Sequence, residues 1–262
     1  MKTVINWKAF FILWVAAILA TIAVLPYALE LVSPILVKLK SQISLPTLIV
    51  LQTTQAAILF AITTFVGLFF AQRIGLEAPI LDAKLKGEAI AGKIQAVLPT
   101  SIALGIVSTL IILGLEFTYF QPTLIQELGN AAKSISLQNQ PAAWKGLLAS
   151  FYGGIAEEIL LRLFVMSFLA WIGSFISKTS DGKPTNTVFW IANILAAVLF
   201  GLGHLPATAM LIPLTPLVII RAIVLNGFVG IACGWLYQTR GLESAMIAHF
   251  SADIVLHVLL AL

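Results

Sequence analysis

Long apolar stretches recur along the entire chain, and they constrain its fold more than any other feature. Hydrophobic residues make up 60% of the 262 residues and charged residues only 10%, whereas a soluble domain carries about 25% charged residues. About 20 consecutive apolar residues cross a bilayer, and the charge-poor stretches leave no room for a separate soluble domain. We therefore expect an all-α, polytopic transmembrane helical bundle built as a single membrane domain.

The apolar stretches predict seven or eight helices. The fourth stretch is too long for one simple crossing, so we expect it to be strongly tilted or broken in two. The predicted helices span about residues 9–36, 46–71, 95–119, 143–177, 187–204, 216–237 and 243–261. The longest linkers between them are 72–94 and 120–142. Within the domain 1–262, we separate the amino-terminal helices and connectors, 1–142, from 143–262, which carries the polar motifs described below.

The linker 72–94 contains Leu81-Asp82-Ala83-Lys84-Leu85-Lys86. This segment can form an interfacial helix whose basic residues face anionic headgroups. A solvated connector explains the same residues.

The basic residues predict an orientation. The net charge of +4 does not indicate a nucleic-acid partner, because the basic residues are scattered between apolar stretches. Cytoplasmic loops of membrane proteins are enriched in Lys and Arg, so we expect a multi-pass protein of the plasma or inner membrane with a cytoplasmic amino terminus. With one crossing by 143–177, this orientation places Lys2, Lys8, Arg73, Lys84, Lys86, Lys93, Lys178, Lys183 and Arg240 inside, and Lys38, Lys40, Lys133 and Lys145 outside.

Two adjacent carboxylates and an arginine interrupt the fourth apolar stretch. Each ion at a bilayer centre costs roughly 2.5 to 3.5 kcal/mol on insertion scales, so Glu157, Glu158 and Arg162 must be compensated. Glu158 and Arg162 are four residues apart and can pair on one helix face. Glu157 points in another direction and can face a cavity, where a carboxylate serves as a general base. A clamp between helices would also explain the charges, but it needs no second carboxylate.

All three histidines lie within apolar stretches or at their ends, where ionisable residues usually mark a functional site. His204 closes one predicted helix and, taken alone, would be an ordinary interfacial residue. His249 and Asp253 are four residues apart and share a face of the last helix. His257 continues that stripe, either as a boundary residue or as an alternative ligand. Histidine and carboxylate side chains are also the groups that bind zinc or activate a water molecule.

Small residues recur between these motifs. Asn226, Gly230 and Gly234 are spaced four residues apart, which is typical of a helix face that packs closely against other helices. We expect the two glycines to be structural. Asn226 must find a hydrogen-bond partner inside the membrane, which makes it a candidate for supporting the site.

The motifs occur in a recognisable order, which is Glu157-Glu158-x-x-x-Arg162, Phe200-x-x-x-His204, Asn226 with its glycines, and His249-x-x-x-Asp253. This set resembles the CPBP intramembrane protease family, and the resemblance covers about residues 143–257. The family includes type II CAAX prenyl endopeptidases and bacterial relatives linked to bacteriocin processing or self-immunity. Each motif is weak alone, so the order and spacing carry the resemblance.

The resemblance implies a role for each motif. Glu157, together with His204, would activate the attacking water. His249 and Asp253 would stabilise the oxyanion or hold a metal ion. The supporting residues would be Glu158, Arg162 and Asn226.

One position departs from the family pattern, which often has asparagine where this chain has Asp253. A carboxylate cannot donate a hydrogen bond to an oxyanion unless it is protonated, and the departure favours metal ligation. His204, His249 and Asp253 would then form a three-ligand zinc site. A metal-free glutamate mechanism uses the same residues, so both forms stay open. Cys233, the only cysteine, excludes a Cys-rich metal site.

We therefore expect an intramembrane endopeptidase that hydrolyses a peptide bond of a membrane-tethered substrate, such as a prenylated CAAX-type peptide, through glutamate-activated water. The alternative is a non-enzymatic membrane protein, either a proton- or ion-coupled transporter or a scaffold, that uses the same buried groups. Transporters often contain inverted repeats, and the sequence shows none. The expected partners are the lipid bilayer and a membrane-tethered peptide or protein, with no nucleic acid.

Overall fold

The computed structural model describes residues 5–38, 44–137 and 140–262. Within these ranges all regular structure is helical, apart from one isolated bridge between Lys178 and Pro184. The predicted all-α class is therefore confirmed. Lys2 and Lys40, which enter the predicted charge distribution, lie outside the described residues.

Among the described residues, six helical segments are long and apolar enough to cross a membrane, by length and composition. They correspond to the helices α1(Trp7–Lys38), α2(Leu45–Ile74), α4(Ala91–Leu115), α8(Asn186–Gly203), α10(Pro216–Arg240) and α11(Leu242–Asp253). Each corresponds to one of the predicted apolar stretches. These segments make the chain a multi-pass membrane protein.

The fourth predicted stretch is one unbroken helical segment. It consists of α6(Ala143–Phe151), η3(Tyr152–Glu157), η4(Ile159–Met166) and α7(Ser167–Gly173). Both η3 and η4 are π-helical. The segment is absent from the six candidates because it carries several charged residues along its length. The alternative of a stretch broken into two pieces is therefore wrong.

The prediction that 120–142 is a linker is also wrong. The π-helical turn η1(Glu116–Phe120) extends α4 directly into α5(Gln121–Leu128) and η2(Gly129–Ile135). Pro122 lies just after the π-helical turn η1, where the regular i→i−4 hydrogen bonding of the helix is already interrupted. Leu124 packs into a small second core with Ile212 and Val218. This long-range packing, which local sequence does not reveal, stabilises the segment.

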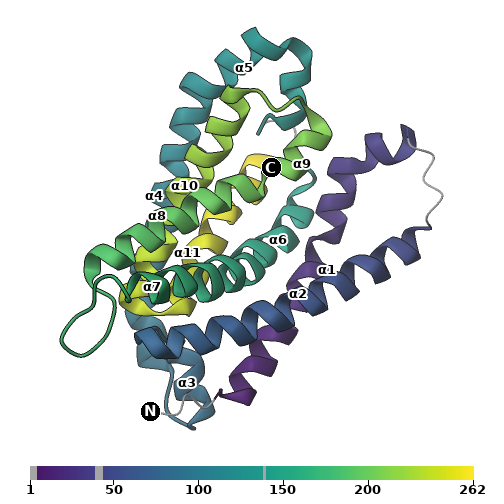
Figure 1. Cartoon of the computed structure of the whole chain (residues 1–262). Coiled ribbons are helices and arrows are strands. Elements are labelled where there is room, and N and C mark those ends of the chain that lie inside the picture. The colour runs from purple at the N-terminus through teal and green to yellow at the C-terminus, as the bar shows by residue number, and fades with distance from the viewer. Residues whose placement is uncertain (1–4, 39–43, 138–139) are drawn as a thin grey trace.

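The linker 72–94 contains a short helix, α3(Pro79–Leu85). Ala83 is buried, and the Leu81 N–H donates a hydrogen bond of 2.7 Å to Oε1 of Glu243. The helix α3 is therefore docked against the start of α11. In Figure 1, α3 and the amino terminus lie at one end of the molecule and α5 lies at the other.

Small residues bring the central helices close together. The helix α10 packs along α8, and α11 packs against both α10 and α4. A Cβ atom on Gly234 would lie 1.8 Å from Oδ1 of Asn193, and one on Gly230 would lie 2.9 Å from Cβ of Ala197. Side chains at these positions would push α8 and α10 apart, which agrees with the predicted structural role of both glycines.

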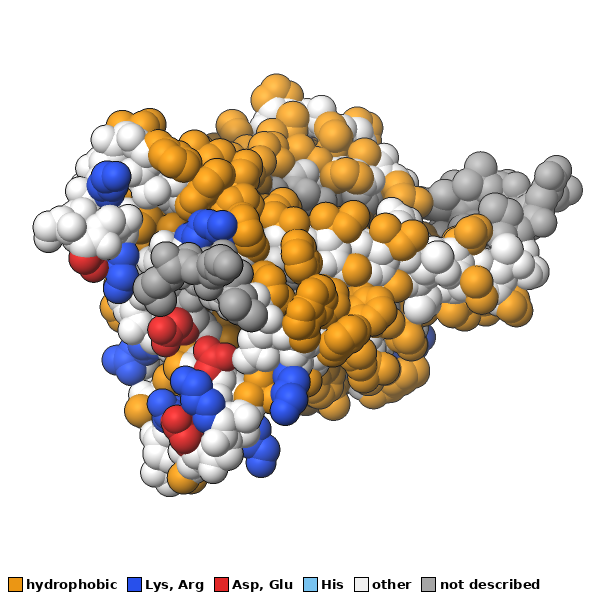
Figure 2. Space-filling model, turned by 60° about the horizontal axis from the view of Figure 1, so that its bottom comes forward, with side chains coloured by type: hydrophobic (Ala, Val, Ile, Leu, Met, Phe, Trp, Pro, Cys, Tyr) orange, Lys and Arg blue, Asp and Glu red, His pale blue; other side chains and the backbone are white. Residues whose placement is uncertain are grey.

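The surface separates into apolar and charged regions. Large exposed side chains of several helices are aliphatic, including Leu19, Val50, Ile58, Leu110 and Ile191. Figure 2 shows apolar side chains over most of the visible face and charged side chains gathered at one end. The apolar region is the surface that a lipid environment would cover.

Candidate active site

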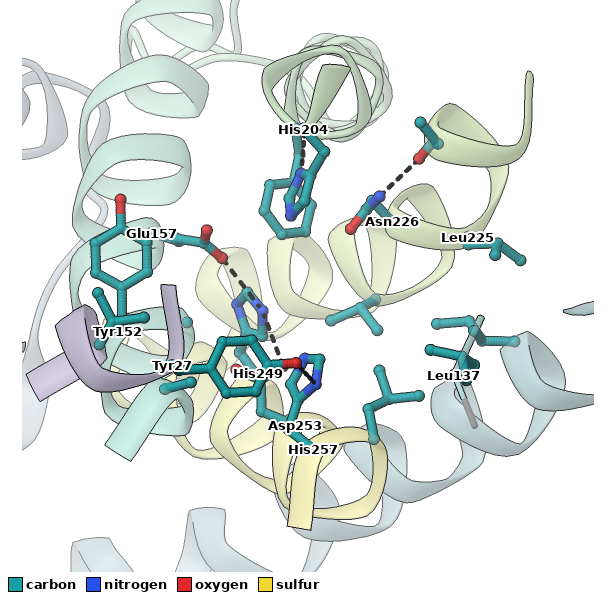
Figure 3. Close-up of a pocket in the computed structure, with 18 of the residues that line it drawn as sticks. Tyr27, Leu137, Tyr152, Glu157, His204, Leu225, Asn226, His249, Asp253 and His257 are labelled. Carbon is teal, nitrogen blue, oxygen red and sulfur yellow. Dashed lines mark hydrogen bonds and ion pairs between the residues drawn. The ribbon is translucent and has the colours of Figure 1, made fainter. Parts of the chain in front are cut away.

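Five of the predicted polar residues meet at one cavity of about 400 Å³. Figure 3 shows their side chains around it. Glu157 comes from η3, His204 from the junction after α8, and Asn226 from α10, while His249 and Asp253 come from α11. Helices far apart in sequence therefore bring the four proposed catalytic residues, and one proposed supporting residue, to a single pocket.

The two adjacent glutamates occupy different environments. The Glu157 side chain is 20% exposed and lines the cavity, whereas the Glu158 side chain is 1% exposed and lies behind it. The π-helical turns η3 and η4 flank this pair. Such turns are rare and occur often at functional sites. The predicted division between a cavity-facing and a paired carboxylate is confirmed in this geometry.

Glu158 joins the two charged motifs. Its Oε2 atom lies 3.4 Å from Nε of Arg162, which forms the predicted ion pair. Its Oε1 atom accepts a 2.8 Å hydrogen bond from Nδ1 of His249. Arg162 is fully buried and also donates from Nη2 to the Gly230 carbonyl at 3.0 Å. Sequence reasoning predicted the ion pair but missed the link to His249, because these partners are separated by most of the family-like segment.

The hydrogen bond to Glu158 directs the second nitrogen of His249 toward the cavity. This atom, Nε2, lies 3.6 Å from Oε2 of Glu157 and 3.7 Å from Oδ1 of Asp253. Both distances are too long for direct hydrogen bonds. They leave room for a water molecule that bridges these groups.

A glycine allows α11 to come this close to η3. A Cβ atom on Gly153 would lie 2.0 Å from Oδ2 of Asp253 and 3.2 Å from Nε2 of His249. Any larger residue would displace these side chains. Gly153 was not predicted, although a glycine four residues before Glu157 on a site-bearing helix is the kind of signal that indicates close approach.

His204 reaches the cavity from a break between two helices. The helix α8 ends at Gly203 and α9(Leu205–Leu211) begins just after His204, with Pro206 in its first turn. The Nδ1–H of His204 donates to the Phe200 carbonyl at 2.9 Å. The Phe200 ring lies edge-on to the imidazoles of both His204 and His249, at 4.9 and 5.4 Å between centroids. This ring therefore fixes the two histidines relative to each other.

Asn226 finds its partner within its own helix. Its Nδ2 atom donates a 2.8 Å hydrogen bond to the Ala222 carbonyl, while the side chain lines the cavity. Its amide retains one further N–H and the carbonyl oxygen.

Three polar side chains that line the cavity were missed from sequence, namely Tyr27, Tyr152 and Arg221. Tyr27 of α1 lines the cavity and lies 3.0 Å from Nδ1 of His257, so the amino-terminal segment contributes to the site. Arg221 also lines the cavity and makes two 2.8 Å hydrogen bonds to the buried carboxylate of Glu116. No local pattern links these pairs, because each joins residues more than a hundred positions apart.

One ligand atom each from Glu158, Cys233 and His249 lie within 4.8 Å of one another, so these three buried side chains could hold a metal ion. This set differs from the predicted zinc ligands His204, His249 and Asp253 and shares only His249 with them. All members of the predicted set line the cavity.

Comparison with known proteins agrees with the motif order. Residues 139–255 match the family model described as Type II CAAX prenyl endopeptidase Rce1-like. No curated protein and no solved structure matches the chain. The matched range includes the predicted catalytic and supporting residues, whereas Tyr27 and His257 lie outside it.

Proposed function

The chain belongs, through residues 139–255, to the Rce1-like type II CAAX prenyl endopeptidases, a family of intramembrane proteases, and we propose that its cavity hydrolyses a peptide bond of a membrane-tethered substrate. One observation carries this proposal: Glu157, His204, His249 and Asp253 line a single cavity within a bundle of apolar helices. The family name makes a prenylated CAAX-type peptide the first substrate to test.

Glu157 is the proposed general base. It faces the cavity, and Arg162 pairs with Glu158 rather than with Glu157. A water molecule between Glu157 and Nε2 of His249 would give its proton to this carboxylate. The resulting hydroxide would attack the substrate carbonyl carbon.

His204 points into the same cavity as Glu157 and His249 (Figure 3). Because its Nδ1–H is used by the Phe200 carbonyl, its Nε2 is the nitrogen left to act on the water or on the developing oxyanion. Asn226 lines the same cavity and retains one amide N–H that can donate to the oxyanion. When the C–N bond breaks, Glu157 returns its proton to the departing amine.

His249 and Asp253 would hold the same water molecule together with Glu157. Glu158 orients the His249 imidazole through Nδ1, in the way that a carboxylate orients histidine in other hydrolases. Asp253 accepts a hydrogen bond from the water as a carboxylate, or donates one to the oxyanion as a carboxylic acid.

The predicted zinc site stays a proposal. His249 Nε2 and Asp253 Oδ1 are 3.7 Å apart, close to the spacing of two ligands around a tetrahedral zinc with bonds of about 2.0 to 2.2 Å. His204 would have to move closer to be the third ligand, because only Glu158, Cys233 and His249 among the described residues have ligand atoms that all lie within 4.8 Å of one another. A bound zinc would make a water molecule more acidic. The Glu158, Cys233 and His249 group suits zinc less well, because the Arg162 guanidinium beside Glu158 repels a second cation.

The orientation predicted from the basic residues also stays a proposal. Exposed Arg73, Lys84, Lys86, Lys93 and Lys183 occupy the regions around α3 and the loop before α8. The Lys183 side chain lies against Gly75, so these regions are neighbours. We infer that this end of the molecule faces the cytoplasm.

The decisive experiment measures cleavage of a membrane-tethered, prenylated CAAX-type peptide by purified protein in liposomes. We expect Glu157→Gln to reduce the rate about 10² to 10⁴-fold. Glu127→Gln, which changes an exposed carboxylate outside the cavity, is the matched control. Equal rates for the wild type and Glu157→Gln would overturn the mechanism. A parallel reaction with a zinc chelator distinguishes the metal-dependent mechanism from the metal-free glutamate mechanism, since only a metal-dependent enzyme loses activity.

A further inference from the structure

His257 is a polar cavity residue that the proposed mechanism does not use. It lies on the π-helical turn η5(Ile254–Val258), one turn beyond Asp253, and it lines the same cavity. Its backbone position is tightly determined, since a Cβ atom on Gly146 would lie 1.8 Å from the His257 carbonyl oxygen. The helix α6 therefore packs directly onto this turn and holds it beside the catalytic groups.

Two neutral partners occupy one side of the His257 ring. Nδ1 lies 3.2 Å from Oε1 of Gln140 and 3.0 Å from the hydroxyl of Tyr27. The Tyr27 hydroxyl donates its proton to the same Gln140 oxygen. Because that oxygen only accepts hydrogen bonds, we assign the proton of the neutral His257 ring to Nδ1. The Tyr27 and His257 rings also pack edge to face, with centroids 5.3 Å apart.

This arrangement determines what Nε2 of His257 can do. A neutral imidazole with a proton on Nδ1 has a bare acceptor at Nε2. Neither Tyr27 nor Gln140 carries a charge that would favour the protonated ring. Among the described residues none forms a hydrogen bond with Nε2, and this atom is not one of the buried polar atoms left unpaired. Nε2 is therefore an oriented acceptor that remains accessible at the cavity wall.

The spacing between this acceptor and Asp253 matches the spacing of main-chain groups in an extended peptide. One helical turn separates His257 from Asp253, which is roughly 5 to 6 Å along the axis. An extended chain advances about 3.3 to 3.6 Å per residue. A peptide whose scissile carbonyl lies beside Asp253 therefore places a main-chain N–H near His257 one or two residues away. Figure 3 shows His257 and Tyr27 beside Asp253 at the same side of the pocket.

We propose that His257 is a positioning residue whose Nε2 accepts a hydrogen bond from a substrate main-chain N–H, one or two residues from the scissile bond, with Tyr27 and Gln140 orienting the ring. This inference rests on the proposed function. It extends the substrate site beyond residues 139–255 to the amino-terminal helix α1. It also names the recognised group, a peptide N–H, which every peptide sequence supplies except at proline.

The test compares His257→Ala with His257→Gln in the liposome cleavage assay. A neutral hydrogen bond contributes about 0.5 to 1.5 kcal/mol, so His257→Ala should raise KM about 3- to 10-fold and leave kcat nearly unchanged. His257→Gln supplies an amide oxygen near the position of Nε2 and should restore most of the wild-type KM. Tyr27→Phe keeps the ring packing but loses the hydroxyl, and should raise KM by a smaller factor.

Substrates methylated at single backbone nitrogens identify the N–H directly. Methylation of one backbone nitrogen within two residues of the scissile bond should raise the KM of the wild type. The same methylation should cause no further increase in the KM of His257→Ala. Thermal unfolding of each variant checks that it is folded. If His257→Ala does not fold, His257→Gln and Tyr27→Phe with the same substrates decide the question.

The outcomes separate the two proposals. If the wild type cleaves no peptide, the proposed function fails and this inference falls with it. If the wild type cleaves and His257→Ala keeps a normal KM, only the inference is overturned. A loss confined to kcat, or a methylation series that affects wild type and His257→Ala equally, would also overturn it.

Discussion

Nδ1 of His249 lies 2.8 Å from Oε1 of Glu158, and both side chains are buried. This hydrogen bond joins the charged centre of the long helical segment 143–173 to α11. It also leaves Nε2 of His249 facing Glu157 and Asp253. Because Arg162 pairs with the other oxygen of Glu158, one carboxylate both neutralises a buried guanidinium and orients the histidine.

Glu158→Gln should therefore affect stability as well as activity. It leaves the fully buried Arg162 without a counter-ion, and removing one partner of a buried pair typically costs about 3 to 5 kcal/mol. We expect a lower free energy of unfolding in detergent and a lower cleavage rate. Glu127→Gln should change neither quantity, since Glu127 is exposed. A Glu158→Gln protein as stable as the wild type would show that the ion pair does not hold the helices.

Gly153→Ala tests the close approach of α11 to η3. The new methyl group would lie 2.0 Å from Oδ2 of Asp253, so Asp253 and His249 must move. Misplacement of catalytic groups by about 1 Å can cost about 10²-fold in rate, and we expect a loss of that order in kcat. The matched control is Gly114→Ala, because a Cβ atom at Gly114 meets nothing within 4 Å. Equal kcat values for the two variants would contradict the assigned geometry.

The buried ion pair between Glu116 and Arg221 predicts a thermodynamic cycle. Glu116→Gln or Arg221→Met alone leaves one charge unpaired, which should cost about 3 to 5 kcal/mol of unfolding free energy. The double variant removes both charges and should recover much of that loss. Chemical or thermal unfolding in detergent measures all three proteins. Losses that simply add in the double variant would contradict this coupling.

A comparison variant for that cycle is Lys183→Met, which removes an exposed ion pair with Asp181. Exposed pairs contribute little to stability, so no resolvable change in unfolding is expected. A large effect here would indicate that the unfolding assay reports something other than buried charge.

Asp82, in α3, predicts a pH effect outside the membrane-spanning segments. Burial raises the pKa of Asp82 above its ordinary value of 3.8; Glu77 adds to the shift and Lys86 opposes it. Below the ordinary pKa the carboxyl is protonated in both the folded and unfolded states. As the pH rises through the folded-state pKa, the folded protein must carry a charge that the unfolded chain carries more easily, so stability is lost.

Asp82→Asn should therefore be more stable than the wild type near pH 7 and equally stable at about pH 3. Thermal unfolding across this range measures the difference. Asp181→Asn is the control of opposite sign, because a hydrogen bond from Thr179 lowers the pKa of Asp181. If Asp82→Asn gains no stability at neutral pH, the burial of this carboxyl has no energetic consequence.

Helical periodicity explains which parts of the site could be read without a structure. Glu158 with Arg162, and His249 with Asp253, are four residues apart, and that spacing places each pair on one face of any helix. Apolar stretches of sufficient length located the membrane segments, because the bilayer core imposes a nearly constant span. The order of the motifs along the chain was enough to predict the family whose model matches residues 139–255.

Contacts between helices could not be predicted from local spacing. The Glu158 to His249 hydrogen bond, the Glu116 to Arg221 pair and the place of Tyr27 in the cavity depend on which helix packs beside which. The apolar stretches alone also failed to show that 120–142 is largely helical, since its buried side chains pack against residues near 212 and 218.

Two factors thus determine the site of this protein, namely local spacing along each helix and packing between helices. Local spacing along a helix decides which side chains share a face, because every residue advances by a constant rotation and rise. Packing of distant helices decides which faces meet, and here Gly153 and Gly146 set how closely α11 and η5 approach their neighbours. The chemistry of each motif could therefore be predicted from the sequence. The common cavity, with Tyr27 and His257 in its wall, is decided only by the tertiary structure.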